Sequence, residues 1–206
     1  MKPSTLWSQY SVLRSTLDIK KGIDMSKYSK LRAFLKRQSG GYLPKKSRVF
    51  TKEQVDNFLN NALDYSYLMQ KVVLVLGVAG AMRCDEIVKL RIDNVEDVKS
   101  ALIIKIPDTK TKRSRSFTVL GENYLCVYRK YIALRPPSLV ERRLFLRYVN
   151  GMCLEMVVGI HKISAAAQEV ATFLKLDNWK EYTGHALRRT SATLLVKGGG
   201  DFTCLK

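Results

Sequence analysis

The sequence predicts an α+β fold that is mostly helical and contains a small antiparallel β-sheet. Apolar residues recur at helical spacing through most of the chain. Two runs rich in β-branched residues, 101–106 and 116–120, flank the polar, basic segment PDTKTKRSR, which is typical of a β-hairpin with a charged tip. The 206 residues are 46% hydrophobic, which is enough for one substantial domain with a small appendage.

Two short basic helices are predicted near the N-terminus, over residues 6–17 and 26–37. The stretch QSGGYLPKKSR, residues 38–48, then combines two glycines, a proline and a basic run. Because glycine and proline interrupt regular structure, this stretch is the best linker in the chain. We therefore expect two domains, a small helical one over residues 1–47 and a larger one over residues 48–206.

The larger domain opens with a helix whose N-terminus is marked by a capping box. Thr51 and Gln54 have the spacing of that motif, and Phe50 with Val55 fits the hydrophobic staple around it. The helix is therefore expected to begin at about Lys52.

A second helix is expected from just after the segment DYSY to about Gly80, and Arg83 follows it directly. Asp85 and Glu86 suit the first turn of a further helix, because carboxylates interact favourably with the positive end of the helix dipole. Arg83 is therefore expected at the start of that helix.

The remaining elements are predicted from periodicity, from the prolines and glycines that end helices, and from an Asn-Gly turn signal. They are a helix over about 122–134 that ends before Pro136, a short strand in RRLFLRYVNGM that leads to the Asn150-Gly151 turn, an amphipathic helix in HKISAAAQEVATFLKL (161–176), and a last helix that ends at glycines 198–200.

Basic residues outnumber acidic ones: 36 Lys and Arg stand against 18 Asp and Glu, which gives a net charge of +18. The excess lies in two zones, because residues 1–50 hold 12 basic and two acidic groups and residues 101–150 hold 11 and three. Such a surplus repels itself and favours a polyanionic partner. Nucleic acid is the leading candidate, and an acidic membrane surface is the second.

The same composition argues against several kinds of site. The four cysteines form no Cys-x-x-Cys pair, and neither histidine has a cysteine at zinc-finger spacing, so we expect no metal site and no disulfide framework. Free cysteines indicate a reducing, intracellular compartment. The N-terminus does not look like a signal peptide, and the most apolar run, residues 72–82, is far shorter than the roughly 20 residues of a bilayer span. No membrane-spanning segment is therefore expected, and of the two candidate partners we expect nucleic acid and not a membrane.

Two pairs of chemically active residues share one spacing. Arg83 and Glu86 stand one helical turn apart, and so do His185 and Arg188. Two guanidinium groups can pair with the non-bridging oxygens of one phosphodiester and oppose the charge that grows in a pentacoordinate transition state. Glu86 would orient Arg83, and His185 would take or hold a proton near pH 7.

The hairpin tip supplies a lysine to this set, and the three segments are expected to converge on one concave face. Lys110 is the first choice and Lys112 a close rival for the group that protonates a leaving oxygen. Further basic residues are expected to contact the DNA backbone: Lys45, Lys46, Arg48, Lys112, Arg113, Arg115 and Arg189.

In this order, the segments resemble the tyrosine recombinase, or phage integrase, family, and in particular the recombinases of eukaryotic mobile elements. GVAGAMRCDEIVKLRIDNV (77–95) is similar to the box that holds the family's first catalytic arginine, and GHALRRTSATLL (184–195) to its His-x-x-Arg box. The basic turn between them is similar to the catalytic-lysine turn. The resemblance covers about residues 48–206, and residues 1–47 resemble the end of the family's helical core-binding domain.

The resemblance implies an integrase-like catalytic core and catalytic roles for Arg83, Glu86, Lys110, His185 and Arg188. It also implies double-stranded DNA as the partner and DNA recombination or integration by phosphodiester transesterification in the full-length form. No metal or other cofactor is implied, and the nucleus is the expected location.

The family's nucleophilic tyrosine, which follows the His-x-x-Arg helix, has no counterpart here, because all ten tyrosines precede His185. The domain over 48–206 is therefore expected to be incomplete at its C-terminal end and inactive alone, with no covalent adduct to DNA. Tyr182 is interpreted as a packing residue. A second copy of this chain or a full-length family member is expected beside it on the DNA, and the full-length member could supply the tyrosine in trans.

Two other interpretations stay open. A non-catalytic DNA-binding module derived from a mobile element fits the same residues, and a basic RNA-associated protein fits the charge. The set Arg83, Lys110, His185 and Arg188 favours a recombinase or a DNA-binding module over an RNA-associated protein. It does not separate the recombinase from the module.

Overall fold

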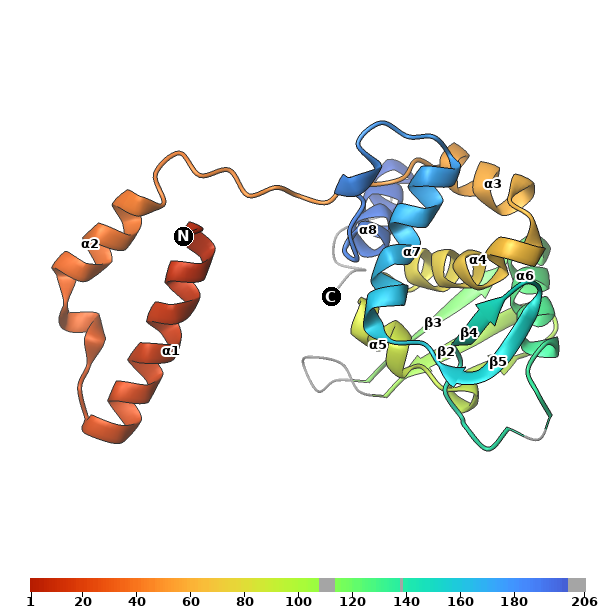
Figure 1. Ribbon diagram of the computed structural model, residues 1–206, viewed down its shortest axis with the longest axis horizontal. Coiled ribbons are helices and arrows are strands. Elements are labelled where there is room, and N and C mark those ends of the chain that lie inside the picture. The colour runs from red at the N-terminus through yellow and green to blue at the C-terminus, as the bar shows by residue number, and fades with distance from the viewer. Residues whose placement is uncertain (108–113, 138, 200–206) are drawn as a thin grey trace. The chain divides into compact units, whose positions relative to one another are not determined.

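The structure is a computed structural model that describes residues 1–107, 114–137 and 139–199 (Figure 1). The chain divides into two compact units, Met1–Lys45 and Lys46–Lys206. This division lies close to the boundary that the linker predicts. The segments singled out for their chemistry belong to the second unit.

The first unit is a pair of helices with little buried surface. It consists of α1 (Pro3–Lys21), the 3-10 turn η1 (Met25–Lys27) and α2 (Ser29–Gln38). Both predicted helices are present. Helix α1 is longer than expected because Pro3 suits a first helical position, and Gly22, at φ 62, ends the helix in the left-handed conformation. The buried apolar side chains of the unit are Met25 and Leu35.

The second unit is built around α4 (Asp64–Ala79), in which every residue from Leu68 to Gly77 is buried. A helix buried on all sides needs protein on all sides. Helices α6, α7 and α8 pack on it directly, as Figure 1 shows. In the described part of this unit, the α-helices besides α4 are α3 (Lys52–Asn61), α5 (Cys84–Lys89), α6 (Glu122–Ala133), α7 (Ile160–Phe173) and α8 (Ala186–Lys197).

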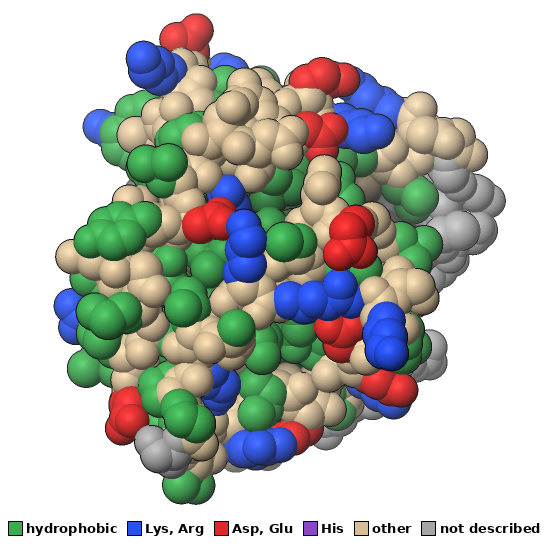
Figure 2. Space-filling view, turned by 90° about the vertical axis from the view of Figure 1, so that its right-hand side faces the viewer, with side chains coloured by type: hydrophobic (Ala, Val, Ile, Leu, Met, Phe, Trp, Pro, Cys, Tyr) green, Lys and Arg blue, Asp and Glu red, His purple; other side chains and the backbone are tan. Residues whose placement is uncertain are grey.

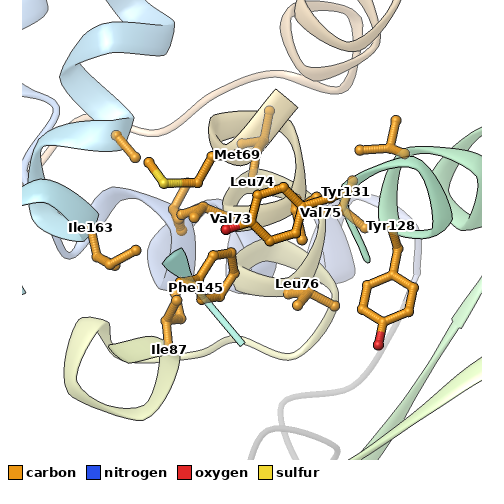
Figure 3. Close-up of a cluster of buried hydrophobic side chains, with 14 of the residues drawn as sticks. Met69, Val73, Leu74, Val75, Leu76, Ile87, Tyr128, Tyr131, Phe145 and Ile163 are labelled. Atoms are coloured by element: carbon orange, nitrogen blue, oxygen red, sulfur yellow. The ribbon is translucent and has the colours of Figure 1, made fainter. Parts of the chain in front are cut away.

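The core joins side chains from segments far apart in the sequence (Figure 3). Val73 and Leu76 of α4 are grouped with Ile87 of α5, Tyr131 of α6 and Ile163 of α7, and all five are buried. Burial of one large apolar side chain contributes about 1.5–3 kcal/mol relative to exposure. This cluster therefore fixes α5, α6 and α7 against α4.

The predicted capping box at the start of α3 is confirmed, whereas the predicted start of α4 is wrong. Thr51 Oγ1 accepts from the Gln54 backbone N–H at 3.2 Å, and Gln54 Oε1 accepts from the Thr51 N–H at 2.9 Å. Helix α4 begins at Asp64 and includes the segment DYSY. The Asp64 carboxylate stabilises this earlier start, since it lies in the first turn and pairs with Lys71 and Lys130, each at 2.7 Å.

The predicted hairpin is part of a three-stranded antiparallel sheet with the order β1-β2-β3. Its strands are β1 (Val95–Asp97), β2 (Ala101–Ile106) and β3 (Arg115–Leu120). Ile106 pairs with Arg115, the last described pair before the predicted tip. The tip itself, residues 108–113, lies outside the described residues. Strand β1 was not predicted, because three residues are too few to show an alternation of apolar and polar side chains.

A second sheet is the two-stranded hairpin of β4 (Leu146–Val149) and β5 (Met152–Val157). The predicted strand and Asn-Gly turn are confirmed: Asn150 and Gly151 have φ values of 48 and 81, the left-handed conformation that a tight hairpin turn requires. Strand β5 was not predicted, since five of its six side chains are exposed and the run lacks a buried face.

Helix α8 approaches α4 closely at a glycine. A Cβ on Gly77 would lie 2.6 Å from Leu187 Cδ1 and 3.1 Å from Leu187 Cβ. The distance between two packed helices depends on the side chains at their contact, so the missing side chain at Gly77 sets the position of α8. The helix ends at Lys197, and Gly198, in the predicted glycine run, is its C-cap.

Replacing Gly77 by alanine should destabilise the second unit by about 1–3 kcal/mol, although alanine is about 1 kcal/mol better than glycine inside a helix. The added methyl group has to displace the buried Leu187 side chain. Denaturant unfolding of the whole chain measures the change. Gly159→Ala is the matched control, since a Cβ there meets nothing within 4 Å. Equal stability of the two variants would contradict the close packing.

Candidate functional site

Arg83 and Glu86 are bonded to each other at the start of α5. Arg83 is the N-cap residue, and its backbone N–H donates to Glu86 Oε2 at 2.9 Å. Its guanidinium Nη1 donates to Glu86 Oε1 at 2.8 Å. The Glu86 side chain is 1% exposed, whereas the Arg83 side chain is 30% exposed. The carboxylate is thus an internal anchor for a guanidinium that reaches the surface.

Arg115, the first residue of β3, binds the same carboxylate. Arg115 Nη2 donates to Glu86 Oε2 at 2.8 Å, and Arg115 Nη1 donates to the carbonyl oxygen of Gly80 at 2.5 Å. Burial opposes the ionisation of Glu86, but hydrogen bonds from Arg83 and Arg115 outweigh it, so the pKa of Glu86 lies below its ordinary value. Glu86 is therefore a carboxylate at neutral pH.

The segment before α8 meets α5 at a second glycine. Cys84 Sγ donates to the carbonyl oxygen of Gly184 at 3.1 Å. A Cβ on Gly184 would lie 2.6 Å from Ser164 Oγ and 2.7 Å from Cys84 Sγ, so this position has no room for a side chain. Because Cys84 follows Arg83 and Gly184 precedes His185, the contact brings together two predicted boxes that are far apart in the sequence.

Arg188 lies in the first turn of α8 and is partly buried. Burial lowers the pKa of its guanidinium, the charges of Arg83 and Arg115 lower it further, and the charge of Glu86 opposes them. The contact of Cys84 with Gly184 brings the start of α5 to the start of α8, so Arg188 belongs to the same region as Arg83 and Glu86. Within the described ranges, no protein group forms a hydrogen bond or an ion pair with the Arg188 guanidinium. We call Arg83, Glu86, Arg115 and Arg188 the arginine cluster.

His185 is the N-cap residue of α8, and its side chain is exposed. Its backbone N–H donates to Thr183 Oγ1 at 3.4 Å, which fixes the turn that leads into the helix. The contact between Cys84 and Gly184 joins the residue after Arg83 to the residue before His185. The basic residues predicted at the hairpin tip lie outside the described residues: Lys110, Lys112 and Arg113.

Besides Arg115, two of the predicted DNA-contact residues are bonded to protein groups. Arg48 Nε pairs with Glu181 Oε2 at 2.8 Å, and Arg189 Nη1 donates to the carbonyl oxygen of Ser47 at 2.7 Å. These bonds hold the start of the second unit against the segment that enters α8. The lysines at 45–46 are exposed.

Tyr182 packs against the core, as the sequence predicts. It is 4% exposed, and its ring stacks on Phe50 at a centroid distance of 4.6 Å. Burial raises the pKa of its hydroxyl group. A buried, protonated phenol stacked on a core ring is not placed to attack a phosphate.

The contact of Arg115 with Glu86 was missed from the sequence, where Arg115 was grouped with the basic residues of the hairpin tip. The signal that could have found it is the alternation along RSFTVL. Phe117 and Val119 face inward, so Arg115, two residues before Phe117, lies on the same protein-facing side of the strand. The contact of Cys84 with Gly184 has no comparable sequence signal.

Other surface features lie apart from the arginine cluster. A cavity of about 510 Å³ is lined mainly by α3, α4, the end of β3 and the end of α8. The face shown in Figure 2 mixes basic, acidic and apolar side chains, so it is not a continuous basic surface.

Among the described side chains, no three His, Cys, Asp or Glu groups are arranged to hold a metal ion. In the same part of the chain, no helix has both the length and the apolar character that a bilayer crossing needs.

Replacing Glu86 by glutamine should lower the free energy of unfolding at pH 7 by about 1–3 kcal/mol, because two guanidiniums lose a buried carboxylate but keep contact with water. Folding lowers the pKa of Glu86, so this stabilisation is present above the ordinary pKa of 4.5 and is lost as the pH falls through the folded-state value. Urea unfolding at several pH values measures it. Glu122→Gln, which alters an exposed ion pair with Arg129, is the control. A deficit of Glu86→Gln that stays constant into the acid range would contradict its ionic origin.

Known proteins resemble the chain in sequence pattern and in fold. Residues 48–206 match the family model described as the phage integrase family. XerA recombinase superposes with a TM-score of 0.60 and 16% identity, over 94% of this chain and 69% of its own. The Tn1549 transposon integrase in complex with a circular intermediate DNA gives 0.66 and 17%, over 100% and 70%. XerH site-specific recombinase bound to its palindromic difH substrate gives 0.59 and 19%, over 81% and 46%.

At these identities the solved structures establish the fold alone, and this chain spans less than half of the XerH chain. No curated protein sequence matches the chain. The family model, by contrast, covers most of the chain and includes Arg83, Arg115 and Arg188 of the arginine cluster. The chain belongs to the phage integrase family, whose members are tyrosine recombinases.

Proposed function

We propose that the second unit binds double-stranded DNA at the arginine cluster and takes part in DNA recombination or integration by phosphodiester transesterification within a larger assembly. One observation supports this most strongly: two guanidiniums bind one buried carboxylate, and the Arg188 guanidinium acts on the same group, in a chain of net charge +18. The cluster has two more positive than negative charges and therefore favours an anion. A DNA phosphate is the anion that the family and the charge together indicate.

In this proposal, Arg83 and Arg188 bind the non-bridging oxygens of one phosphate. Guanidinium forks match such oxygens in geometry, and their charge stabilises the additional negative charge of the transition state. Glu86 holds Arg83 through bonds of 2.8 and 2.9 Å, so little reorganisation is needed when the phosphate arrives. The exposed His185 would contribute a side chain for proton transfer or hydrogen bonding, and Lys110 or Lys112 would give a proton to the leaving oxygen.

The attacking tyrosine is proposed to lie outside residues 1–206, and another family member on the same DNA is one source of it. All ten tyrosines of the sequence precede His185, and Tyr182 is buried against Phe50. The same observation favours a second candidate function, a DNA-binding module without catalysis. Trapping on a nicked duplex separates the two candidates, because a covalent protein–DNA band from a complex with a tyrosine-bearing partner supports the catalytic role.

Duplex DNA should bind with little sequence preference, and the affinity should fall steeply with salt, since each phosphate contact contributes a slope of about −0.9. Arg83→Gln and Arg188→Gln should each weaken binding about tenfold, and the slope should fall by about 0.9 when both arginines are replaced and the phosphate contact is lost. If both arginines bind one phosphate, the double variant should lose less affinity than the two single losses combined. Fluorescence anisotropy at several salt concentrations measures the affinities, the salt slopes and the loss of affinity in the double variant.

Lys105→Gln is the matched control for these variants. It removes one positive charge from β2, where Lys105 forms an exposed ion pair with Glu96 at 3.1 Å. Loss of this charge should leave the affinity nearly unchanged. The proposed site is contradicted if the arginine variants bind no more weakly than Lys105→Gln, or if the salt slope is the same in all of them.

A further inference from the structure

Arg115 connects the two ends of the turn that contains Arg83. Before the turn, Arg115 Nη1 donates at 2.5 Å to the carbonyl oxygen of Gly80, the C-cap residue of α4. After the turn, Arg115 Nη2 donates at 2.8 Å to Glu86 Oε2. The guanidinium is planar and rigid, so one side chain fixes the separation of both ends.

The turn is also strained and tightly packed. Ala81 has a φ of 46, in the left-handed region that disfavours residues with a Cβ, so surrounding contacts have to hold it there. A Cβ on Gly80 would lie 2.3 Å from the ring of Phe117. Arg115 and Phe117 lie on the same side of β3, and both hold the same turn.

Glu86 depends on Arg115 for its charge as well as for its position. A buried carboxylate loses its interactions with water, and partners have to replace them. Arg83 supplies one Nη and its backbone N–H, and Arg115 supplies a second guanidinium. Because the two arginines share this task, the remaining N–H groups of Arg83 are not needed by Glu86.

We propose that Arg115 is a positioning residue: it binds Gly80 and Glu86 so that the Arg83 guanidinium is aimed at a phosphate, and it does not contact DNA itself. The inference rests on the proposed function, in which Arg83 binds that phosphate. Arg115 is also three residues after Lys112 in the sequence, so the strand that follows the predicted lysine tip is fixed to the Arg83 turn.

A double-mutant cycle on DNA affinity tests the inference. Arg115→Gln should weaken duplex binding about tenfold in the wild-type background but less than about twofold in the Arg83→Gln background, because its effect passes through Arg83. The salt slope should be the same in Arg83→Gln and in the double variant. Lys105→Gln is the matched control. Lys105 lies opposite Ser116 in the sheet register, next to Arg115, and its ammonium group forms an exposed ion pair with Glu96.

A second measurement does not depend on DNA. The ¹³C signal of the Glu86 carboxyl group, followed by NMR against pH, should give a higher pKa in Arg115→Gln than in the wild type. Among the described residues, the charged groups that act on Glu86 are Arg83, the N-cap residue of α5, and Arg115 on β3, and Glu86 in turn acts on Arg188 of α8. Arg115→Lys, which keeps the charge but not the two-armed geometry, should restore part of the DNA affinity. Thermal unfolding of each variant shows whether the fold is kept.

The outcomes separate this inference from the proposed function. If Arg83→Gln binds DNA as well as Lys105→Gln, the proposed function fails. If Arg83→Gln is weak and Arg115→Gln causes an equal further loss in both backgrounds, with the slope lower by about 0.9, Arg115 binds a phosphate of its own and the inference is wrong. An unchanged Glu86 pKa in folded Arg115→Gln would also overturn it.

Discussion

The buried carboxylate of Glu86 is the interaction on which the site depends. An unpaired charge in this position would cost several kcal/mol, so the fold has to bring positive groups to it. Arg83 reaches Glu86 through the backbone and the guanidinium, and Arg115 reaches it from β3. These bonds fix two cations on one anion, and Arg188 adds a third cation from α8. The surplus of positive charge in the arginine cluster therefore follows from the neutralisation of the buried Glu86 carboxylate.

Three glycines let the elements approach closely enough for this arrangement. Gly77 admits Leu187 of α8, Gly80 admits the ring of Phe117 on β3, and Gly184 lies against Cys84. A methyl group at any of these positions would push α8 or β3 away from α4 and α5. The positions of Arg115 and Arg188 relative to Arg83 thus depend on backbone positions that carry no side chain, as well as on the charges themselves.

The local part of the fold could be predicted from the sequence. The capping box of Thr51 and Gln54, the β2–β3 pairing and the Asn150-Gly151 turn depend on residues close in the chain, and the structure contains all three. The start of α4 could not be predicted, because Asp64 is stabilised there partly by Lys130, which lies far along the chain. Strand β1 depends in the same way on its pairing with β2.

The candidate site, like the fold, could be predicted in its local part but not in its long-range contacts. The i, i+3 spacings identified Arg83 with Glu86 and His185 with Arg188, because each pair lies within one helical turn, and the resemblance to a family supplied their expected roles. What the sequence did not show is how the pairs meet. Arg115 reaches Glu86 across 29 positions, and Cys84 reaches Gly184 across 100. Such contacts follow from the packing of whole elements, which no local pattern encodes.

The central claim is that Arg83 and Arg188 act on one phosphate while Arg115 stays bonded to Glu86. The guanidinium Nε–H signals of these three arginines, followed by NMR as a short DNA duplex is added, test it most directly. We expect the Arg83 and Arg188 signals to shift together with one Kd, and to return together when salt is added, while the Arg115 signal changes little. A shift of Arg188 without Arg83 would contradict the claim, because the two guanidiniums would then not share a ligand.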